Sequence, residues 1–445
     1  MVKKLFGTDG IRGVAGEFPL DQVTVMQIGR SLAGHMGAEC SPKFVIARDT
    51  RESGEWIEGA FVRGAASAGA QCLSAGVMTT PGLAFLTGEY GFDAGVVISA
   101  SHNPFQDNGL KVFLPSGKKL GRDAETLIEN DIAVGGRLEP GDLTPDASRA
   151  GEFQKVYVRH LETKVPDLDL KGYRIVVDCA NGAASALAPP LFEFFGADVT
   201  AINNAPNGRN INLDSGSLHL NHLQAKVREI GADFGVAFDG DADRALFVDE
   251  KGDIVDGDAT LWIMARHLER NGKLKNRTIV STVMSNIGLE LALSSVGVKM
   301  VRTSVGDKYV LDELLASGSE LGGEQSGHII FPSESLVGDG MLTAVFVLNA
   351  IRTGGCSLSE AVEGFVRYPQ VLLNVRVREK LPFESVPEIS AASKAIENEI
   401  EGTGRLLLRY SGTENLARVM IEGKHQAVID EQAKRLAAVI ENALG

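Results

Sequence analysis

Apolar, β-branched runs alternate with longer amphipathic stretches through most of the chain. Three segments share one order: a strand, a loop, an amphipathic helix, a Gly followed by Ala or Val, and a second strand. They begin with KFVIARD at residue 43, YRIVVDCANGAA at residue 173 and RTIVSTVMSNIG at residue 277. Strands that alternate with helices of this length predict parallel sheets covered by helices. The threefold occurrence predicts three related α/β domains.

Each segment continues into a further strand that ends in a polar loop. The three stretches are VVISASHNP (96–104), FGVAFDGDADR (234–244) and ELGGEQSGHII (320–330). In open α/β sheets, ligands bind beyond the carboxyl ends of the strands. We therefore expect the three loops to meet in one composite site.

The remainder of the chain reads strand, helix, strand, strand, helix, which predicts a smaller α+β domain. A Gly/Pro/Asp-rich stretch at 135–148 predicts a linker between the first two domains. The expected domains are residues 1–148, 149–252, 253–366 and 367–445.

Composition and charge narrow the possible partners. The 445-residue chain is 44% hydrophobic and 23% charged, as globular proteins are, and its net charge of −14 argues against nucleic-acid binding. An anionic ligand would need a local cluster of cations. Four scattered cysteines indicate neither zinc nor disulfides. The longest apolar run, MLTAVFVLNAI, is too short to span a bilayer and predicts a buried helix. MVKKLFGTDG lacks a signal-peptide pattern, so we expect a cytoplasmic protein.

Asp239, Asp241 and Asp243 alternate in DGDADR. Three close carboxylates repel one another unless a cation lies between them, and oxygen ligands select a hard ion such as Mg²⁺. An EF-hand is the rival interpretation, with Glu250 at its position 12, but Arg244 stands where the loop needs Gly. The flanking sequences also resemble strands rather than helices. A solvated acidic turn is the third alternative.

Ser101 has no nearby sequence motif that would supply a base. A serine that carries a phosphoryl group needs none, because phosphoryl transfer depends on positioning and charge neutralisation. A phosphate on Ser101 would complete the coordination begun by the aspartates, whereas without the acidic loop Ser101 would be an ordinary strand-exit residue. Since a unit pair 4 Å apart is worth about 4 kcal/mol at an effective dielectric of ~20, the site also requires cations. The candidates are Arg12, Lys111 and Arg244.

Two further loops have polar side chains in favourable positions. Glu324, Ser326 and His328 alternate between glycines, which suits a polyhydroxylated ligand, and the imidazole can also move protons. A plain turn is the alternative.

RYSGTENLAR, in the last domain, offers donors for a phosphate group, although a Ser-Gly hairpin turn explains it equally well. Its candidate residues are Arg409, Ser411, Gly412, Thr413 and Arg418. Two phosphate sites beside a sugar site are what a mutase needs and a phosphatase does not.

With these motifs the chain resembles the α-D-phosphohexomutases over essentially its whole length. The likeness rests on KLFGTDGIRGVAG, SASHNP, DGDADR, GGEQSGHI and SGTENLARVM, in the family's order. LFGTDGIRG and CANGAA are closest to the branch that acts on glucosamine phosphates. Branches that act on glucose or mannose phosphates share most of these motifs, so they stay an alternative.

The resemblance implies four α/β or α+β domains around a central cleft, the first three with mixed sheets of related topology. It implies that Ser101 becomes phosphoserine and that Ser101 and the three aspartates bind one Mg²⁺. Glu324 and Ser326 would contact sugar hydroxyls, the last loop would bind the second phosphate, and Lys111 and His328 would assist proton transfer or charge stabilisation. Glucosamine 1,6-bisphosphate would be the intermediate and activator. A homodimer is compatible with this family, and no membrane or nucleic-acid partner is expected.

The phosphate loop departs from the family pattern at two positions. The family usually has R-P-S-G-T-E-P, and here Tyr410 and Asn415 replace the prolines. Because proline fixes φ and stiffens a turn, we expect a more mobile empty loop. The donor residues themselves are retained.

Overall fold

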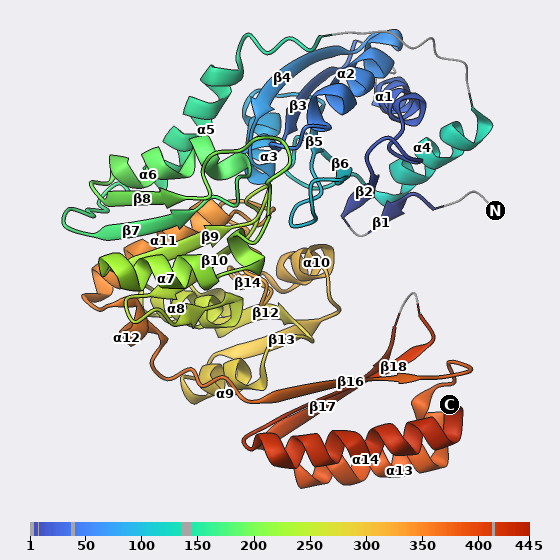
Figure 1. Cartoon of the computed structure of the whole chain (residues 1–445), viewed down its shortest axis with the longest axis vertical. Coiled ribbons are helices and arrows are strands. Elements are labelled where there is room, and N and C mark those ends of the chain that lie inside the picture. The colour runs from blue at the N-terminus through green and yellow to red at the C-terminus, as the bar shows by residue number, and fades with distance from the viewer. Residues whose placement is uncertain (1–3, 8, 37–40, 136–143, 412–413) are drawn as a thin grey trace.

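Four sheets, one after another along the chain, organise the molecule (Figure 1). The computed structural model describes residues 4–7, 9–36, 41–135, 144–411 and 414–445. The first three sheets are mixed and the fourth is antiparallel, with orders β1-β2-β6-β5-β3-β4, β11-β10-β9-β7-β8, β13-β12-β14-β15 and β16-β18-β17. The expected fold class, three related α/β units followed by a smaller α+β unit, is confirmed.

The first three sheets share one core arrangement. A central strand (β3, β7 or β12) pairs in parallel with the next strand along the chain and, on its other side, with the strand after that. This third strand then pairs antiparallel with its successor. The repeated order explains why the three sequence segments look alike. It also places the loops after β5, β9 and β14 at equivalent positions of three sheets.

The first unit supplies the serine loop. Its elements are β1 (Phe6–Gly7), β2 (Gly10–Val14), α1 (Gln22–Met36), β3 (Lys43–Arg48), α2 (Gly54–Ser67), β4 (Gln71–Val77), α3 (Thr80–Glu89), β5 (Ala94–Ile98), β6 (Asp107–Phe113) and α4 (Arg122–Val134). Residues 136–143 of the expected linker lie outside the described residues. Asp146 forms a parallel bridge to Leu73 on β4, so the end of the linker follows the first sheet.

The second unit supplies the acidic loop. It comprises α5 (Ala150–Lys164), β7 (Arg174–Asp178), α6 (Ala188–Phe194), β8 (Asp198–Ile202), α7 (Asn221–Ile230), β9 (Phe234–Phe238), β10 (Ala245–Asp249) and β11 (Ile254–Val255). β11 completes this sheet from just beyond residue 252, and the domain boundaries stay predictions.

The third unit supplies the loop of Glu324. It comprises α8 (Gly257–Arg270), β12 (Thr278–Thr282), α9 (Ile287–Ser295), β13 (Lys299–Thr303), α10 (Asp307–Ser317), β14 (Gly322–Gly323), β15 (Ile329–Ile330), α11 (Gly340–Gly354) and α12 (Leu358–Val362). The apolar run MLTAVFVLNAI lies in α11 and is almost wholly buried, as expected. No helix in the described part of the chain is both long enough and apolar enough to cross a membrane.

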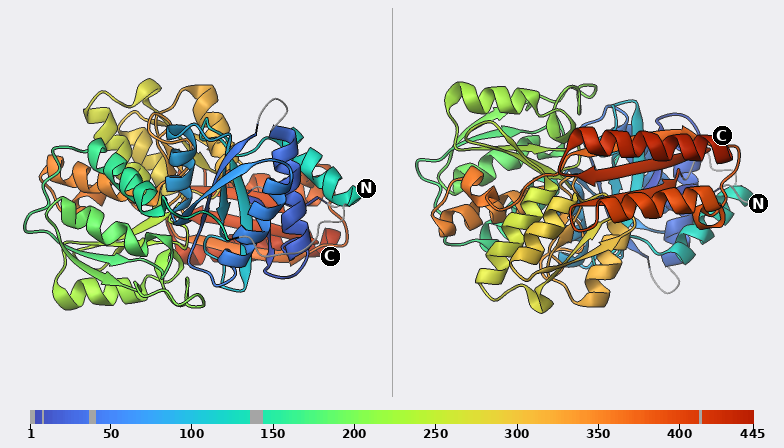
Figure 2. Two further views of the ribbon diagram at one scale, coloured as in Figure 1. Left: turned by 90° about the horizontal axis from the view of Figure 1, so that it is seen from above. Right: turned by 90° about the horizontal axis from the view of Figure 1, so that it is seen from below.

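The fourth unit is β16 (Gln370–Arg376), α13 (Pro387–Glu399), β17 (Gly404–Tyr410), β18 (Leu416–Gly423) and α14 (Gln426–Leu444). Both helices cover the outer face of its sheet (Figure 2). The short 3₁₀ turns in the described residues are at Ala183–Ala186, Gly216–Leu218, Lys275–Arg277 and Phe383–Ser385.

Apolar packing divides the molecule unequally. One continuous core runs through the first three units, from Val45 on β3 to Leu358 on α12. The fourth unit has a core of its own. Among the described residues, its hydrogen bonds and ion pairs to the rest of the chain all go to the third unit. The buried carboxylate of Glu422 lies at the centre of these contacts and accepts from the N–H of Ile287 at 3.1 Å.

Candidate active site

Three loops from three sheets enclose one cleft. A cavity of about 440 Å³ is lined by residues of the N-terminal strands, the serine loop, the acidic loop, the start of α10 and the 324–328 loop. Its chemically active lining residues are Asp9, Arg12, His102, Asp243, Arg244, Asp307, Glu324 and His328. The expected meeting of the three strand-end loops is therefore observed.

The acidic loop is a tight connection between two antiparallel strands. β9 and β10 pair with Phe238 opposite Ala245, so residues 239–244 form a hairpin loop. This geometry excludes the EF-hand, whose calcium loop joins two helices. Ala242 has a φ of 55°, a left-handed conformation that costs energy for a residue with a side chain and often marks functional sites. The turn buries Asp239, Asp241 and Asp243 together.

Ser101 lies directly against this loop. Its hydroxyl donates to Oδ2 of Asp239 at 2.6 Å, although the two residues belong to different sheets. Ser101 is 1% exposed, and its φ of 52° is also left-handed. Gly240 makes the approach possible, because a Cβ there would lie 2.5 Å from the carbonyl oxygen of Ser101.

Two buried donors hold the backbone of the serine loop. Arg51 donates from Nη2 to the carbonyls of Ser101 at 3.0 Å and Asn103 at 2.7 Å. Nδ2 of Asn212 donates to the same two carbonyls at 2.8 and 3.0 Å. The CANGAA segment supports the acidic loop in a similar way, because the N–H of Ala183 donates to the carbonyl of Gly240 at 2.9 Å. Both loops are therefore preorganised by neighbours.

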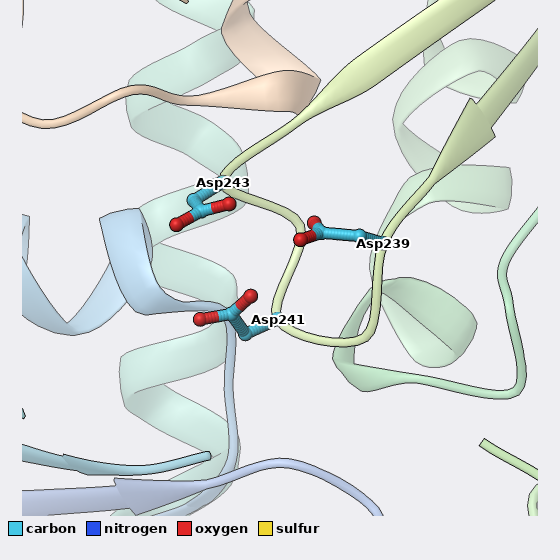
Figure 3. A group of neighbouring side chains, drawn as sticks. All are labelled: Asp239, Asp241 and Asp243. Atoms are coloured by element: carbon cyan, nitrogen blue, oxygen red, sulfur yellow. The ribbon is translucent and has the colours of Figure 1, made fainter. Parts of the chain in front are cut away.

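The aspartates fit a divalent cation. One carboxylate oxygen from each lies within 4.8 Å of the others, and the three side chains gather around one turn (Figure 3). Oδ1 of Asp241 and Oδ1 of Asp243 are buried without a hydrogen-bond partner. Buried carboxylate oxygens without partners are costly, and a hard cation would satisfy them. The donor set consists of oxygens alone, which suits Mg²⁺.

Lys111 is the central cation of the site. It is 1% exposed, and its Nζ lies 2.9 Å from Asp241, 3.0 Å from Asp9 and 3.5 Å from Asp243. Burial would lower the pKa of this ammonium, but the surrounding carboxylates raise its pKa well above the ordinary value. The side chain therefore stays charged and offsets part of the acidic cluster.

The aspartates differ in their electrostatic surroundings. Burial raises the pKa of Asp239 well above its usual value, and the neighbouring Asp243 and Asp241 raise it further. Burial acts in the same direction on Asp243, but Lys111, His328 and Arg244 hold its pKa well below the usual range. The pKa of His102 falls to about 4 because of burial and the nearby guanidinium of Arg244.

His328 joins the acidic loop to the third unit. Its Nδ1 lies 3.7 Å from Oδ2 of Asp243, and its Nε2 accepts from the N–H of Gly338 at 3.2 Å. The second contact places the ring proton of the neutral imidazole on Nδ1, facing Asp243. Burial alone would lower the pKa of His328, but Asp243 raises it above the ordinary value.

Glu324 lines the same cleft. Its Oε1 accepts from the N–H of Gly306 at 3.0 Å, and Ser326 donates weakly to its Oε2 at 3.4 Å. Arg12 also lines the cleft, and it donates to Asp9 at 2.6 Å and to Asn103 at 3.4 Å. The cleft therefore offers both carboxylate acceptors and guanidinium donors.

The described residues of the fourth unit that we expect to bind phosphate are not among the lining of this cleft. Among the described residues, Arg409, Ser411 and Arg418 do not line the cleft, and Gly412 and Thr413 lie outside the described residues. Arg409 and Arg418 are cross-strand partners on β17 and β18, and Nε of Arg418 is buried without a partner. Tyr410 stacks on Phe383, with ring centroids 4.1 Å apart.

The stacking of Tyr410 on Phe383 concerns the expectation that this loop, which lacks the family's prolines, is more mobile. Tyr410 also donates from its hydroxyl to the carbonyl of Leu381 at 2.6 Å, so a side-chain anchor stands where the family has proline. The greater mobility expected for this loop stays a prediction.

Sequence reasoning missed three charged residues, of which Asp9 and Asp307 line the cleft and Lys119 pairs with both of them. Asp9 forms ion pairs with Arg12, Lys111 and Lys119, and Lys119 also reaches Asp307 at 2.5 Å. Asp9 lies in the same motif as Arg12, and its place beside that cation was an available signal. Lys119 and Asp307 lie in no motif, and only the folded chain brings them together.

Sequence models of the phosphoglucomutase/phosphomannomutase family match the chain almost throughout. The matches are alpha/beta/alpha domain I at residues 3–136, domain II at 155–252, domain III at 256–368 and the C-terminal domain at 372–439. The chain is 49% identical to the phosphoglucosamine mutase of Solibacter usitatus, with all of both chains covered. It is 46% identical to that of Geobacter sp. (strain M21), with 100% and 99% covered.

Solved structures agree on the fold. A phosphoglucomutase/phosphomannomutase family protein from Burkholderia thailandensis superposes with a TM-score of 0.78 at 24% identity, covering 100% of this chain and 98% of that one. Aspergillus fumigatus N-acetylphosphoglucosamine mutase, in complex with GlcNAc-6P and magnesium, gives 0.67 at 20% identity, covering 99% and 96%. The chain therefore belongs to the phosphoglucomutase/phosphomannomutase family, the α-D-phosphohexomutases.

Proposed function

We propose that this enzyme is a phosphoglucosamine mutase, which interconverts glucosamine 6-phosphate and glucosamine 1-phosphate through a phosphorylated Ser101. The observation that carries the proposal is the position of the Ser101 hydroxyl, 2.6 Å from Asp239 at the edge of a carboxylate cluster. Full-length relatives at 45–49% identity bear the name phosphoglucosamine mutase, which supports the choice of sugar. The product leads to UDP-N-acetylglucosamine and the cell wall.

The reaction has two phosphoryl transfers. In the first, O1 of glucosamine 6-phosphate attacks the phosphorus of phosphoserine, the bond between phosphorus and Oγ breaks, and O1 releases its proton. The product of this step is glucosamine 1,6-bisphosphate. After the intermediate turns round, Oγ of Ser101 takes the phosphoryl group from O6, and glucosamine 1-phosphate leaves. Phosphate is conserved over the cycle.

Cations of the chain stabilise the moving charge. Lys111 and Arg244 lie within the carboxylate cluster, and Arg12 lines the same cleft. Asp239, Asp241 and Asp243, with the phosphate on Ser101, would hold a Mg²⁺ ion, which would supply further neutralisation of the phosphoryl oxygens. His328, beside Asp243, is placed to exchange a proton with the sugar hydroxyl.

Two further sets of residues orient the substrate. Glu324 and Ser326 accept from and donate to sugar hydroxyls in the cleft. Arg409, Ser411, Gly412, Thr413 and Arg418 bind the phosphate that is not being transferred, for which forked guanidinium donors are suited. A phosphatase would have no use for this second phosphate loop. A cytoplasmic location and a homodimer are further predictions.

A coupled assay with matched substrates tests the proposed activity. Glucosamine, glucose and mannose 6-phosphates are compared under identical conditions with added bisphosphate. We expect kcat/KM to be highest for glucosamine 6-phosphate. A higher value for glucose or mannose 6-phosphate would instead make the chain a phosphoglucomutase or phosphomannomutase, and release of inorganic phosphate alone would make it a phosphatase.

Ser101→Ala removes the proposed phosphoryl carrier. We expect isomerisation to be abolished while the fold is kept, because the hydroxyl contributes only its hydrogen bonds to Asp239 and His102 to stability. Activity is measured by the same assay, the fold by circular dichroism, and the phosphoserine by mass spectrometry of the parent enzyme. Ser67→Ala on α2 is the matched control and should be fully active. More than a trace of activity in Ser101→Ala would remove Ser101 from the covalent role.

Asp241→Asn tests the metal site. The amide keeps an acceptor for Lys111 and Thr80 but loses the charge that attracts a hard cation. We expect Mg²⁺ binding, measured by isothermal titration calorimetry, to weaken at least tenfold, with a matching rise in the Mg²⁺ concentration needed for activity. Asp253→Asn, at an exposed carboxylate in the next loop, should change neither value. Unaltered Mg²⁺ binding by Asp241→Asn would contradict the assignment.

Arg418→Ala tests the second phosphate site. A hydrogen bond to a charged group contributes about 1.5–3 kcal/mol, so we expect KM to rise about 10- to 100-fold with a smaller change in kcat. Arg376→Ala, an exposed arginine on the neighbouring strand β16, is the control. An unchanged KM in Arg418→Ala would discredit the phosphate loop.

A further inference from the structure

A second cavity lies behind one wall of the catalytic cleft. It measures about 340 Å³ and lies between the segment that joins β6 to α4 and the first turns of α10. Gly7, Gly10 and Asp307 line both cavities. The second cavity lacks the serine and acidic loops, and Lys111 is the one described residue proposed to act in the reaction that also lines it.

The residues that line this cavity carry a net positive charge, whereas the whole chain is negatively charged. Six cations line it: Lys4, Lys111, Lys118, Lys119, Arg122 and Lys308. Three acids line it as well, Glu125, Asp307 and Asp312, which leaves a formal charge of +3 (6 − 3) in a chain of net charge −14. A concave cationic surface on an acidic protein attracts anions selectively.

Three of these six cations form no ion pair with another described residue. Lys111 and Lys119 are held by acids of the cleft, and Arg122 pairs with Glu125 at 3.2 Å. Lys4, Lys118 and Lys308 have no ion pair within the described part of the chain, and all three are exposed. Their charges are therefore available to a ligand.

The rest of the lining is apolar. Phe6, Val112, Leu120, Leu336 and Val337 form the floor, and Tyr309 is 44% exposed beside them. An inorganic anion would leave these side chains without a partner. A planar or apolar group attached to the anion would cover them and gain burial.

Helix α4 adds donors at the same place. It begins next to Gly121, which provides no side-chain cap, and both Gly121 and Arg122 line the cavity. The first N–H groups of a helix lack partners within the helix and favour an anion.

We propose that this cavity binds an organic phosphate with an aromatic or apolar body, of the nucleoside diphosphate class, as an effector separate from the substrate. The phosphates lie among Lys4, Lys118 and Lys308, and the base lies on Tyr309 and the apolar floor. Asp307 and Lys119 separate this cavity from the cleft, so an occupant here changes the charge balance next to the substrate. The proposal goes beyond the mutase activity and does not require it.

Calorimetry with the purified full-length enzyme tests the proposal, with UDP as the probe and uridine and pyrophosphate as matched controls. We expect UDP to bind in the micromolar to millimolar range and each control to bind at least tenfold more weakly. Lys118→Ala/Lys308→Ala should weaken UDP binding at least tenfold, and added salt should weaken it in the parent enzyme. Lys394→Ala/Lys434→Ala, which removes two exposed lysines of the fourth unit, should have no effect.

Three results would overturn the proposal. The first is absence of UDP binding, and the second is binding that Lys118→Ala/Lys308→Ala leaves unchanged. The third is strictly competitive displacement of UDP by glucosamine 6-phosphate, because UDP would then occupy the catalytic cleft. Inactivity toward every hexose phosphate would instead refute the mutase proposal while leaving this one standing.

Discussion

The contact between Ser101 and Asp239 is the constraint on which the site depends. The two side chains come from different sheets, and each loop is useful only where the other is present. The contact persists because Gly240 admits the carbonyl of Ser101 and because Arg51 and Asn212 hold the carbonyls of Ser101 and Asn103. Two left-handed residues, Ser101 and Ala242, are kept in conformations that an unsupported loop would leave.

Burying so many acids requires compensation that the sequence motifs show only in part. Desolvation of an unpaired carboxylate costs several kcal/mol, and pairing with a buried cation recovers much of it. Lys111 contributes to three carboxylates at once, while Arg244 contacts Asp243 at 3.8 Å. A phosphoserine would add negative charge to this cluster. A divalent cation and the cationic side chains would together neutralise that charge.

Short sequence patterns predicted the order of the helices and strands and the local turns. The repeated strand-helix-strand order, the hairpin around Asp239 and the buried helix at 340–354 follow from periodicity and turn residues within short windows. Lys119 and Asp307 escaped detection because their pairing joins residues 188 positions apart, and neither lies in an unusual local pattern. The place of Arg409 and Arg418 relative to the cleft depends on how the fourth unit docks, which no local signal encodes.

Because the fourth unit has a separate apolar core, it can move relative to the first three units more easily than they can move relative to one another. The serine, acidic and sugar loops all project from units that share one apolar core, so their mutual geometry is set by close packing. The fourth unit has its own core and meets the third through polar contacts around Glu422, Asn286 and Arg405. In the proposed reaction, a bisphosphate that turns round between two transfers would need a fixed reacting centre and a second anchor that can release and rebind it. A phosphate-binding loop on the separately packed unit would satisfy both requirements, because polar contacts rearrange at lower cost than a shared core.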